Sequence, residues 1–172
     1  MDSFVLWITG LSGSGKSTLA DLVFAELKKT NNRIEKLDGD IVRDVFPSTG
    51  FTESERNEHI KRIGFLASIL ERNEVIVIAS FISPYRKSRK FVRNRCHNFV
   101  EIYVKTSLAE CEKRDVKGLY KKVRKGEIKN FTGIDAPYEI PQNPELIIDT
   151  EMLSQDQAAQ KILDYVYKRF GE

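Results

Sequence analysis

Apolar residues along this chain follow two alternating patterns. Short, nearly continuous apolar runs lie next to turns that contain glycine, aspartate or asparagine, and the segments between them repeat apolar residues every three or four positions. Such runs are typical of strands buried in a parallel sheet, and the longer spacing is typical of helices with one apolar face. The expected strands are 4–8, 34–37, 75–79, 99–104 and 146–148.

The helical spacing falls between these runs. It covers 19–27, extends from 53 to 70, begins again near Tyr85, and returns at 108–114 and 159–170. Strands that alternate with helices predict βαβ units, so we expect an α/β fold in which a parallel sheet has helices on both faces. We expect the run 75–79 to be the central strand. Ligands of such sheets lie at the carboxyl ends of the strands.

Length and composition favour one domain over residues 1–172. The chain has 41% hydrophobic and 31% charged residues, and a chain of this length buries a sizeable core without disulfides or a structural metal. A net charge of only +3 is too weak to indicate binding to nucleic acid or a membrane, and we expect neither as a partner. The run 4–8 is too short to span a bilayer and lacks the flanks of a signal peptide, so we expect a cytoplasmic protein. Two cysteines without CxxC spacing and two distant histidines argue against a zinc site.

The strongest chemical signal is a glycine-rich turn between the first strand and the first helix. Residues 10–17 satisfy the pattern G-x-x-x-x-G-K-[ST], whose glycines let successive backbone N–H groups point at the phosphates of a nucleotide. The dipole of the following helix adds positive potential, Lys16 reaches the β- and γ-phosphates, and Ser17 is a ligand for Mg²⁺. The segment predicts binding of ATP and Mg²⁺ through Gly10, Leu11, Ser12, Gly13, Ser14, Gly15, Lys16, Ser17 and Thr18.

Two carboxylates after the second predicted strand indicate the class of nucleotide-binding protein. No NKxD guanine-recognition motif is present, and the run 75–79 ends in Ser80 where a Walker B aspartate would stand. Switch GTPases and large ATPases are therefore poor fits. Asp38 and Asp40 offer one carboxylate for magnesium-bound water and one that orients or deprotonates an acceptor hydroxyl, which is what a small-molecule kinase needs. An ordinary Asp-Gly-Asp turn is the alternative.

Basic residues point to an anionic second substrate. Arg43 follows Asp40 by three residues, and Arg56 lies near the start of the next helix. Arginine suits bidentate recognition of phosphate or sulfate, and surface ion pairs are the alternative for both residues. The basic run 114–129 also contains glycines, and it is either a solvated helix face or a mobile lid that closes over phosphates.

An ordered set of short motifs extends over nearly the whole chain. They are Gly10-Leu-Ser-Gly-Ser-Gly-Lys-Ser-Thr18, Leu37-Asp-Gly-Asp40 with Arg43, Gly50-Phe51, Arg62-Ile-Gly64, Phe81-Ile-Ser-Pro-Tyr-Arg86, Cys111-Glu-Lys-Arg-Asp115, Lys117-Gly-Leu-Tyr120, Gly126-Glu-Ile128, Phe131-Thr-Gly-Ile-Asp135 and Pro137-Tyr-Glu139. In this order the motifs resemble the adenylylsulfate (APS) kinase family of P-loop small-molecule kinases. The resemblance implies the reaction ATP + adenylyl sulfate → ADP + 3′-phosphoadenylyl sulfate in sulfate assimilation, with Mg²⁺ as cofactor.

The resemblance also implies roles for individual residues. Asp40 lies nearest the acceptor's ribose 3′-hydroxyl, and Asp38 supports the water shell of Mg²⁺. Phe51 and Phe131 stack on the acceptor's base, which contributes about 1–3 kcal/mol per contact by analogy with nucleic-acid stacking. The other acceptor-binding positions are Arg43, Arg56, His59, Ile82, Ser83, Lys117 and Leu119.

The family also implies a lid and a special serine. Arg114 lies against the adenine of ATP, and the segment 115–131 is a lid whose closure excludes water from the site. Ser83 matches a serine described as a phosphoserine intermediate. The sequence supplies no neighbouring base for it, and direct in-line transfer needs only positioning and charge neutralisation. We therefore expect Ser83 to act in binding or in the geometry of the strand end.

One position beside the acceptor departs from the family pattern. His59 stands where familiar members have an asparagine that hydrogen-bonds the acceptor. A neutral histidine still offers a hydrogen-bond donor, so adenylyl sulfate stays the expected acceptor. The alternatives are another nucleotide conjugate, such as the cytidine diphosphoramidate of capsule modification, and a non-catalytic nucleotide-binding regulatory module. The family's tendency to dimerise predicts a homodimer.

Overall fold

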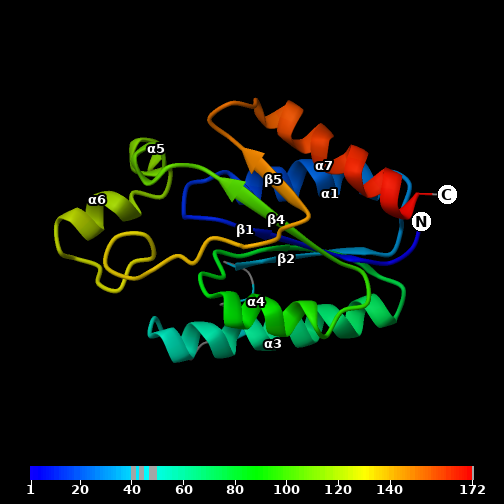
Figure 1. The fold of residues 1–172 in the computed structure, drawn as a ribbon, viewed down its shortest axis with the longest axis horizontal. Helices are drawn as coiled ribbons and strands as arrows, with labels where there is room; N and C mark the ends of the chain where they lie inside the picture. Colours follow the sequence, from blue (N-terminus) through cyan, green and yellow to red (C-terminus); the bar gives the residue numbers. More distant parts are fainter. Residues whose placement is uncertain (40–41, 43–44, 47–49, 172) are drawn as a thin grey trace.

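Five parallel strands form one sheet at the centre of the molecule (Figure 1). The structure is a computed structural model, and it describes residues 1–39, 42, 45–46 and 50–171. The strands lie in the order β2-β3-β1-β4-β5. Their bounds are β1 Val5–Thr9, β2 Ile34–Asp38, β3 Ile76–Ser80, β4 Phe99–Lys105 and β5 Leu146–Asp149.

Helices cover both faces of the sheet (Figure 1). On one face lie α1 (Lys16–Lys28) and α7 (Gln155–Phe170), and on the other lie α3 (Glu53–Arg72) and α4 (Arg86–Arg93). Side chains alternate between the two faces along each strand, and each face therefore has its own buried apolar cluster. Two short helices, α5 (Leu108–Arg114) and α6 (Leu119–Arg124), lie beyond the carboxyl end of β4.

Side-chain capping marks the beginnings of α3 and α7 but not that of α1. Thr52 and Ser154 each form a capping box at the start of α3 and α7, in which a hydroxyl accepts a hydrogen bond from a backbone N–H three residues later. At α1 the N-cap is Gly15, and no side chain caps the helix. The first N–H groups of α1 are therefore suited to an anionic ligand.

The predicted α/β fold is confirmed, with one correction to the strand order. The sheet is parallel and has helices on both faces. The expectation that the run 75–79 is the central strand is wrong, because β1 is central and β3 lies between β1 and β2. Both strands are completely buried, so their hydrophobicity does not reveal which one is central. Within the described ranges, no helix has both the length and the apolar character needed to cross a membrane.

Candidate active site

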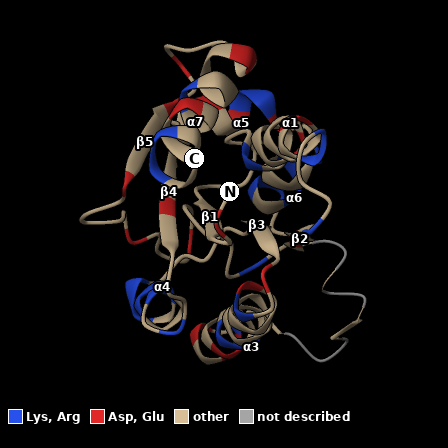
Figure 2. Cartoon of the chain, turned by 90° about the vertical axis from the view of Figure 1, so that its right-hand side faces the viewer, with Lys and Arg blue, Asp and Glu red and all other residues tan. Residues whose placement is uncertain are grey.

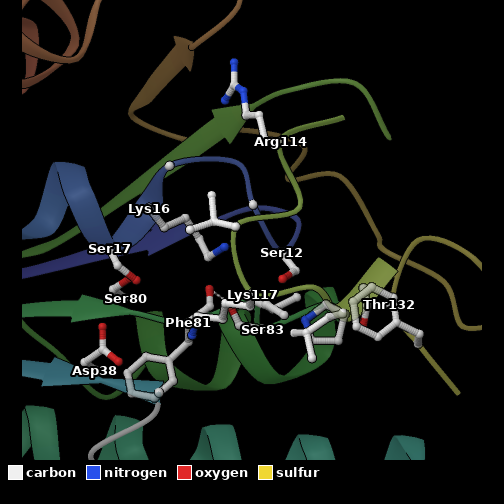
Figure 3. Close-up of a pocket in the computed structure, with 18 of the residues that line it drawn as sticks. Ser12, Lys16, Ser17, Asp38, Ser80, Phe81, Ser83, Arg114, Lys117 and Thr132 are labelled. Carbon is white, nitrogen blue, oxygen red and sulfur yellow. Dashed lines mark hydrogen bonds between the residues drawn. The ribbon is translucent and has the colours of Figure 1, made fainter. Parts of the chain in front are cut away.

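A cavity of about 700 Å³ opens at the carboxyl end of the sheet (Figure 3). Its wall combines the glycine-rich loop, the ends of β2 and β3, the start of α3 and parts of the segment 114–132. The parallel strands direct all these pieces to one edge of the sheet. Residues that are far apart in the sequence therefore face one cavity.

Glycine is required at specific points of the loop. Gly13 and Gly15 have φ angles of +77° and +97°, in the left-handed region that other residues rarely adopt. A Cβ atom at Gly10 would lie 2.6 Å from the carbonyl oxygen of Val104, so the loop packs tightly against β4. This conformation wraps the loop backbone and the first turn of α1 around one end of the cavity, which suits phosphate groups.

Not every predicted loop residue faces the cavity. Its wall includes Ser12, Gly13, Gly15, Lys16, Ser17 and Thr18. Leu11 instead lines a second cavity, together with Gly133. Ser14 is completely buried, and Gly10 packs against β4. These three residues therefore lie outside the cavity wall and support the conformation of the loop.

Lys16 turns its ammonium group back over the loop (Figure 3). Nζ donates a hydrogen bond of 2.6 Å to the carbonyl oxygen of Leu11, and only 8% of the residue is exposed. Burial lowers the pKa of Lys16 to about 8, because desolvation disfavours the charged form. A phosphate group nearby would favour the charged form again.

Two side chains that the sequence analysis does not assign support the loop. Tyr120 Oη donates to the carbonyl oxygen of Ser12 at 2.8 Å, and Thr150 Oγ1 donates to that of Ser14 at 3.2 Å. The guanidinium of Arg114 binds both Oγ1 and the carbonyl oxygen of Thr150 at 3.0 Å. Because Tyr120 and Thr150 lie more than a hundred positions from the loop in the sequence, no local motif reveals their contacts with it.

Oxygen atoms suited to Mg²⁺ lie where α1 meets the ends of the strands. Ser17 is in the first turn of α1 and Asp38 ends β2, and both line the cavity. Magnesium binds oxygen, keeps several waters and uses one or two carboxylates beside substrate phosphates. The described residues contain no cluster of three or more His, Cys, Asp or Glu that would hold a metal by itself. The donor set therefore fits Mg²⁺ that arrives with a nucleotide.

Two aromatic rings and an arginine line another part of the cavity. Phe51 and Phe131 both belong to its wall. The guanidinium of Arg56 lies 6.0 Å from the centre of the Phe51 ring, and it donates to Thr132 Oγ1 at 2.5 Å and to the carbonyl oxygen of Asn130. Arg56 therefore ties the start of α3 to the segment that carries Phe131.

Most of the remaining positions predicted to bind the acceptor line the cavity, and the others lie outside the described residues. Those that line the same cavity are His59, Ile82, Ser83, Lys117 and Leu119. His59 is 6% exposed and packs edge-on against Phe81, with ring centres 6.2 Å apart. Asp40 and Arg43 lie outside the described residues.

The basic run 114–129 divides into two parts. Lys117 and Lys129 line the cavity, whereas Lys121, Lys122 and Arg124 of α6 are exposed; Figure 2 shows the basic residues of α6 in blue. The alternative of a solvated helix face therefore describes α6 itself. A lid remains the prediction for the segments on either side of it.

Hydrogen bonds enclose the hydroxyl group of Ser83. The residue is 1% exposed, and its Oγ accepts from Trp7 Nε1 at 3.1 Å and donates to Thr9 Oγ1 at 3.0 Å. Thr9 Oγ1 donates in turn to the carbonyl oxygen of Ile82 at 2.7 Å. The hydroxyl group thereby anchors the strand-end segment to β1, where it is poorly placed for nucleophilic attack.

Arg89 of α4 joins the segment that contains Ser83 to the later segment that contains Glu139. Its side chain is 3% exposed, and two of its nitrogens donate to the carbonyl oxygens of Ser83 and Glu139, each at 2.5 Å. Nε donates to Glu101 Oε1 at 2.8 Å, and Arg93 binds the other oxygen of the same carboxylate at 3.2 Å. These partners satisfy a buried charge that the sequence analysis did not single out.

The fold and this cavity define a P-loop kinase for small molecules. A parallel sheet carries the glycine-rich loop into α1, and a strand-end carboxylate and a second ligand region share the cavity. Residues 2–149 match the adenylylsulphate kinase family. The chain belongs to this family.

Similar proteins and solved structures are also adenylyl-sulfate kinases. An adenylyl-sulfate kinase of Halothermothrix orenii is 47% identical over 165 residues, which cover 95% of this chain and 89% of that protein. The structure of the Mycobacterium tuberculosis APS kinase in complex with AMPPNP and APS has a TM-score of 0.90 and 38% identity, and the match covers 96% of this chain and 98% of that one. A hexameric APS kinase from Thiobacillus denitrificans has a TM-score of 0.76 and 36% identity, over 99% of this chain and 30% of that one.

Proposed function

We propose that this chain transfers the γ-phosphoryl group of ATP to the ribose 3′-hydroxyl of adenylyl sulfate, which yields ADP and 3′-phosphoadenylyl sulfate. The observation that carries the proposal is the single cavity that joins a phosphate loop to a pair of aromatic rings. The loop suits the phosphates of the donor, and the rings suit the base of the acceptor. Family membership and the relative with bound AMPPNP and APS support the same reaction.

On the donor side, the chain binds the phosphates of ATP and neutralises their charge. The N–H groups at the start of α1 and the ammonium of Lys16 surround one end of the cavity. Mg²⁺ would be held by the Ser17 hydroxyl and, through water, by the Asp38 carboxylate. When bound, the ion stabilises the charge that develops on the transferred group.

On the acceptor side, the chain orients the nucleotide that receives the phosphoryl group. Phe51 and Phe131 stack on the base, and Arg56 holds the segment that carries Phe131 in place. We assign removal of the proton from the acceptor hydroxyl to Asp40 on the sequence alone. Ser83 positions the cavity wall, and direct transfer between the two substrates needs no covalent step on it.

A coupled assay of ADP release tests the reaction. Purified chain with ATP and Mg²⁺ receives either adenylyl sulfate or cytidine diphosphoramidate as acceptor. We expect turnover with adenylyl sulfate, and Lys16→Ala should lower kcat by about a hundredfold or more, since it removes a charge that stabilises the transition state. Negligible turnover of adenylyl sulfate beside rapid turnover of the cytidine compound would identify a different acceptor. No turnover with either would favour a non-catalytic binding module.

A second measurement tests the acceptor site by itself. Phe131→Leu should raise KM for adenylyl sulfate by about 5- to 150-fold, which corresponds to about 1–3 kcal/mol of stacking, and should leave KM for ATP nearly unchanged. Phe65 is half exposed on α3 and lies outside the cavity wall, so Phe65→Leu is the matched control. Equal effects on both KM values would contradict the assignment of the ring to the acceptor.

We also propose that the chain acts in the cytoplasm as a homodimer. Cys96 and Cys111 are free thiols, which suits a reducing compartment. The hexameric APS kinase of Thiobacillus denitrificans is a precedent for self-association in the family. Light scattering of the purified chain at several concentrations measures the assembly directly, and a monomer throughout would contradict the dimer.

A further inference from the structure

Ser80 ends β3 at the wall of the cavity, and the reaction described so far gives it no role. The residue is 4% exposed, and its Oγ has no hydrogen-bond partner among the described residues. A buried hydroxyl group without a partner is costly and uncommon. A ligand or a bound water that reaches this hydroxyl group would satisfy it.

Strand geometry fixes the direction in which Ser80 points. Ile78 belongs to the apolar cluster beneath α1 and α7, and residues two apart on a strand face the same side. By the same rule Asp38 shares the side of Ile34, which belongs to that cluster too. Lys36, between Ile34 and Asp38, confirms the direction because it pairs with Asp21 of α1. Ser80 and Asp38 thus both face α1.

The register brings the two residues together. Asp38 and Ser80 are direct partners in the β2–β3 ladder, and adjacent strands lie about 4.8 Å apart. Ser17 is in the first turn of α1, and Figure 3 shows the Ser17 and Ser80 hydroxyl groups close together in the view, with the Asp38 carboxylate below them. Three oxygen-bearing side chains from three elements therefore face the same end of the cavity.

We propose that the Ser80 hydroxyl is part of the magnesium site, where it binds a water of the Mg²⁺ shell between Ser17 and Asp38. The inference rests on the proposed magnesium site. Mg²⁺ keeps several of its waters in proteins, and side chains that hold such waters contribute strongly to metal affinity. In P-loop NTPases a Walker B aspartate at the end of a strand helps to hold Mg²⁺, and Ser80 stands where that aspartate would. Here a second carboxylate directly opposite Asp38 would add like-charge repulsion, which a neutral hydroxyl group avoids.

Titration calorimetry of ADP with and without Mg²⁺ tests the proposal. We expect Mg²⁺ to raise the ADP affinity of the wild type, and Ser80→Ala to reduce that gain about tenfold without changing the affinity measured in EDTA. Ser68 is the matched control: it is 3% exposed, and its hydroxyl donates to the Phe65 carbonyl oxygen on α3 at 2.7 Å. Ser68→Ala should keep the full gain from Mg²⁺.

Thermal unfolding of the ligand-free protein provides an independent measurement. Ser80→Ala removes a hydroxyl group without a partner and should raise Tm by about 2–4 °C, whereas Ser68→Ala breaks a hydrogen bond and should lower it. A full gain from Mg²⁺ in Ser80→Ala, or a fall in its Tm like that of Ser68→Ala, would overturn the role of Ser80. If Mg²⁺ does not change the ADP affinity of the wild type, the magnesium site itself is wrong.

Discussion

At the scale of single residues, burial and function impose opposite demands on Lys16. Its position in the loop suits a positive charge next to phosphates, but burial lowers its pKa from 10.5 to about 8. The unfolded chain therefore keeps this proton up to a higher pH than the folded chain does. It follows that Lys16 makes the free energy of unfolding rise with pH between about 8 and 10.5 in the absence of a nucleotide.

Nucleotide binding should reverse this shift and take up a proton. Because burial lowers the pKa of Lys16 to about 8 in the free protein, part of the Lys16 side chains is neutral near that pH, and phosphates that favour the charged form should draw in a fraction of a proton per ADP bound. Calorimetry in buffers of different ionisation enthalpy measures the uptake. Lys16→Arg is the control, because arginine stays charged and should show none. Uptake that persists in Lys16→Arg would assign it to another group.

Ser83→Ala separates a structural role from a covalent one. The Ser83 hydroxyl is engaged by Trp7 and Thr9, and the loss of such hydrogen bonds costs about 0.5–1.5 kcal/mol each. We expect kcat to fall less than about tenfold, KM for the acceptor to rise by a similar factor, and the intact mass of the wild type to show no phosphate after incubation with ATP alone. A loss of kcat of about a thousandfold or more would show that transfer passes through Ser83.

At the scale of elements, α4 matters for the site through the charges on its buried face. Arg89 extends from α4 to β4 and to two carbonyl oxygens of the segments beside the cavity. Arg93, one turn further along α4, binds Glu101 and Glu145 but is one-third exposed. Helix and sheet are therefore joined by the buried cation of Arg89 and the partly exposed cation of Arg93, and only Arg89 holds the cavity wall.

Removal of the two arginines should have unequal effects. Arg89→Met leaves the Glu101 carboxylate buried with one cation fewer and should cost about 3–5 kcal/mol of unfolding free energy, measured by urea denaturation. Arg93→Met should cost clearly less, because its charge is partly solvated. The double variant Arg89→Met/Glu101→Leu should regain part of the loss, and equal costs for the two single variants would contradict the distinction.

At the scale of the whole molecule, local patterns predict the elements and the loop but not the contacts between distant segments. Short apolar runs are sufficient to predict the strands. The spacing of glycines is sufficient to predict the phosphate loop, because glycine readily adopts the positive φ angles found there. The supports of that turn, Tyr120 and Thr150, come from segments more than a hundred positions away. The hydrogen bond between Arg89 and the carbonyl oxygen of Glu139 likewise joins residues fifty positions apart. Such contacts depend on how the strands are ordered, and the apolar runs do not encode that order.

The same whole-molecule arrangement predicts that the two substrates bind cooperatively. Lys117, Leu119 and Phe131 belong to one segment, and all three line the cavity shared by the phosphate loop and Phe51. If the first ligand orders this segment, the second binds without that entropic cost. The rise in Tm with ADP and adenylyl sulfate together should therefore exceed the sum of the separate rises by at least about 2 °C, as expected for a coupling of about 1 kcal/mol. Thr132→Val removes one of the two hydrogen bonds from Arg56 to this segment and should shrink this excess more than it shrinks the rise with ADP alone. Strictly additive rises in the wild type would mean that the segment does not respond to both ligands.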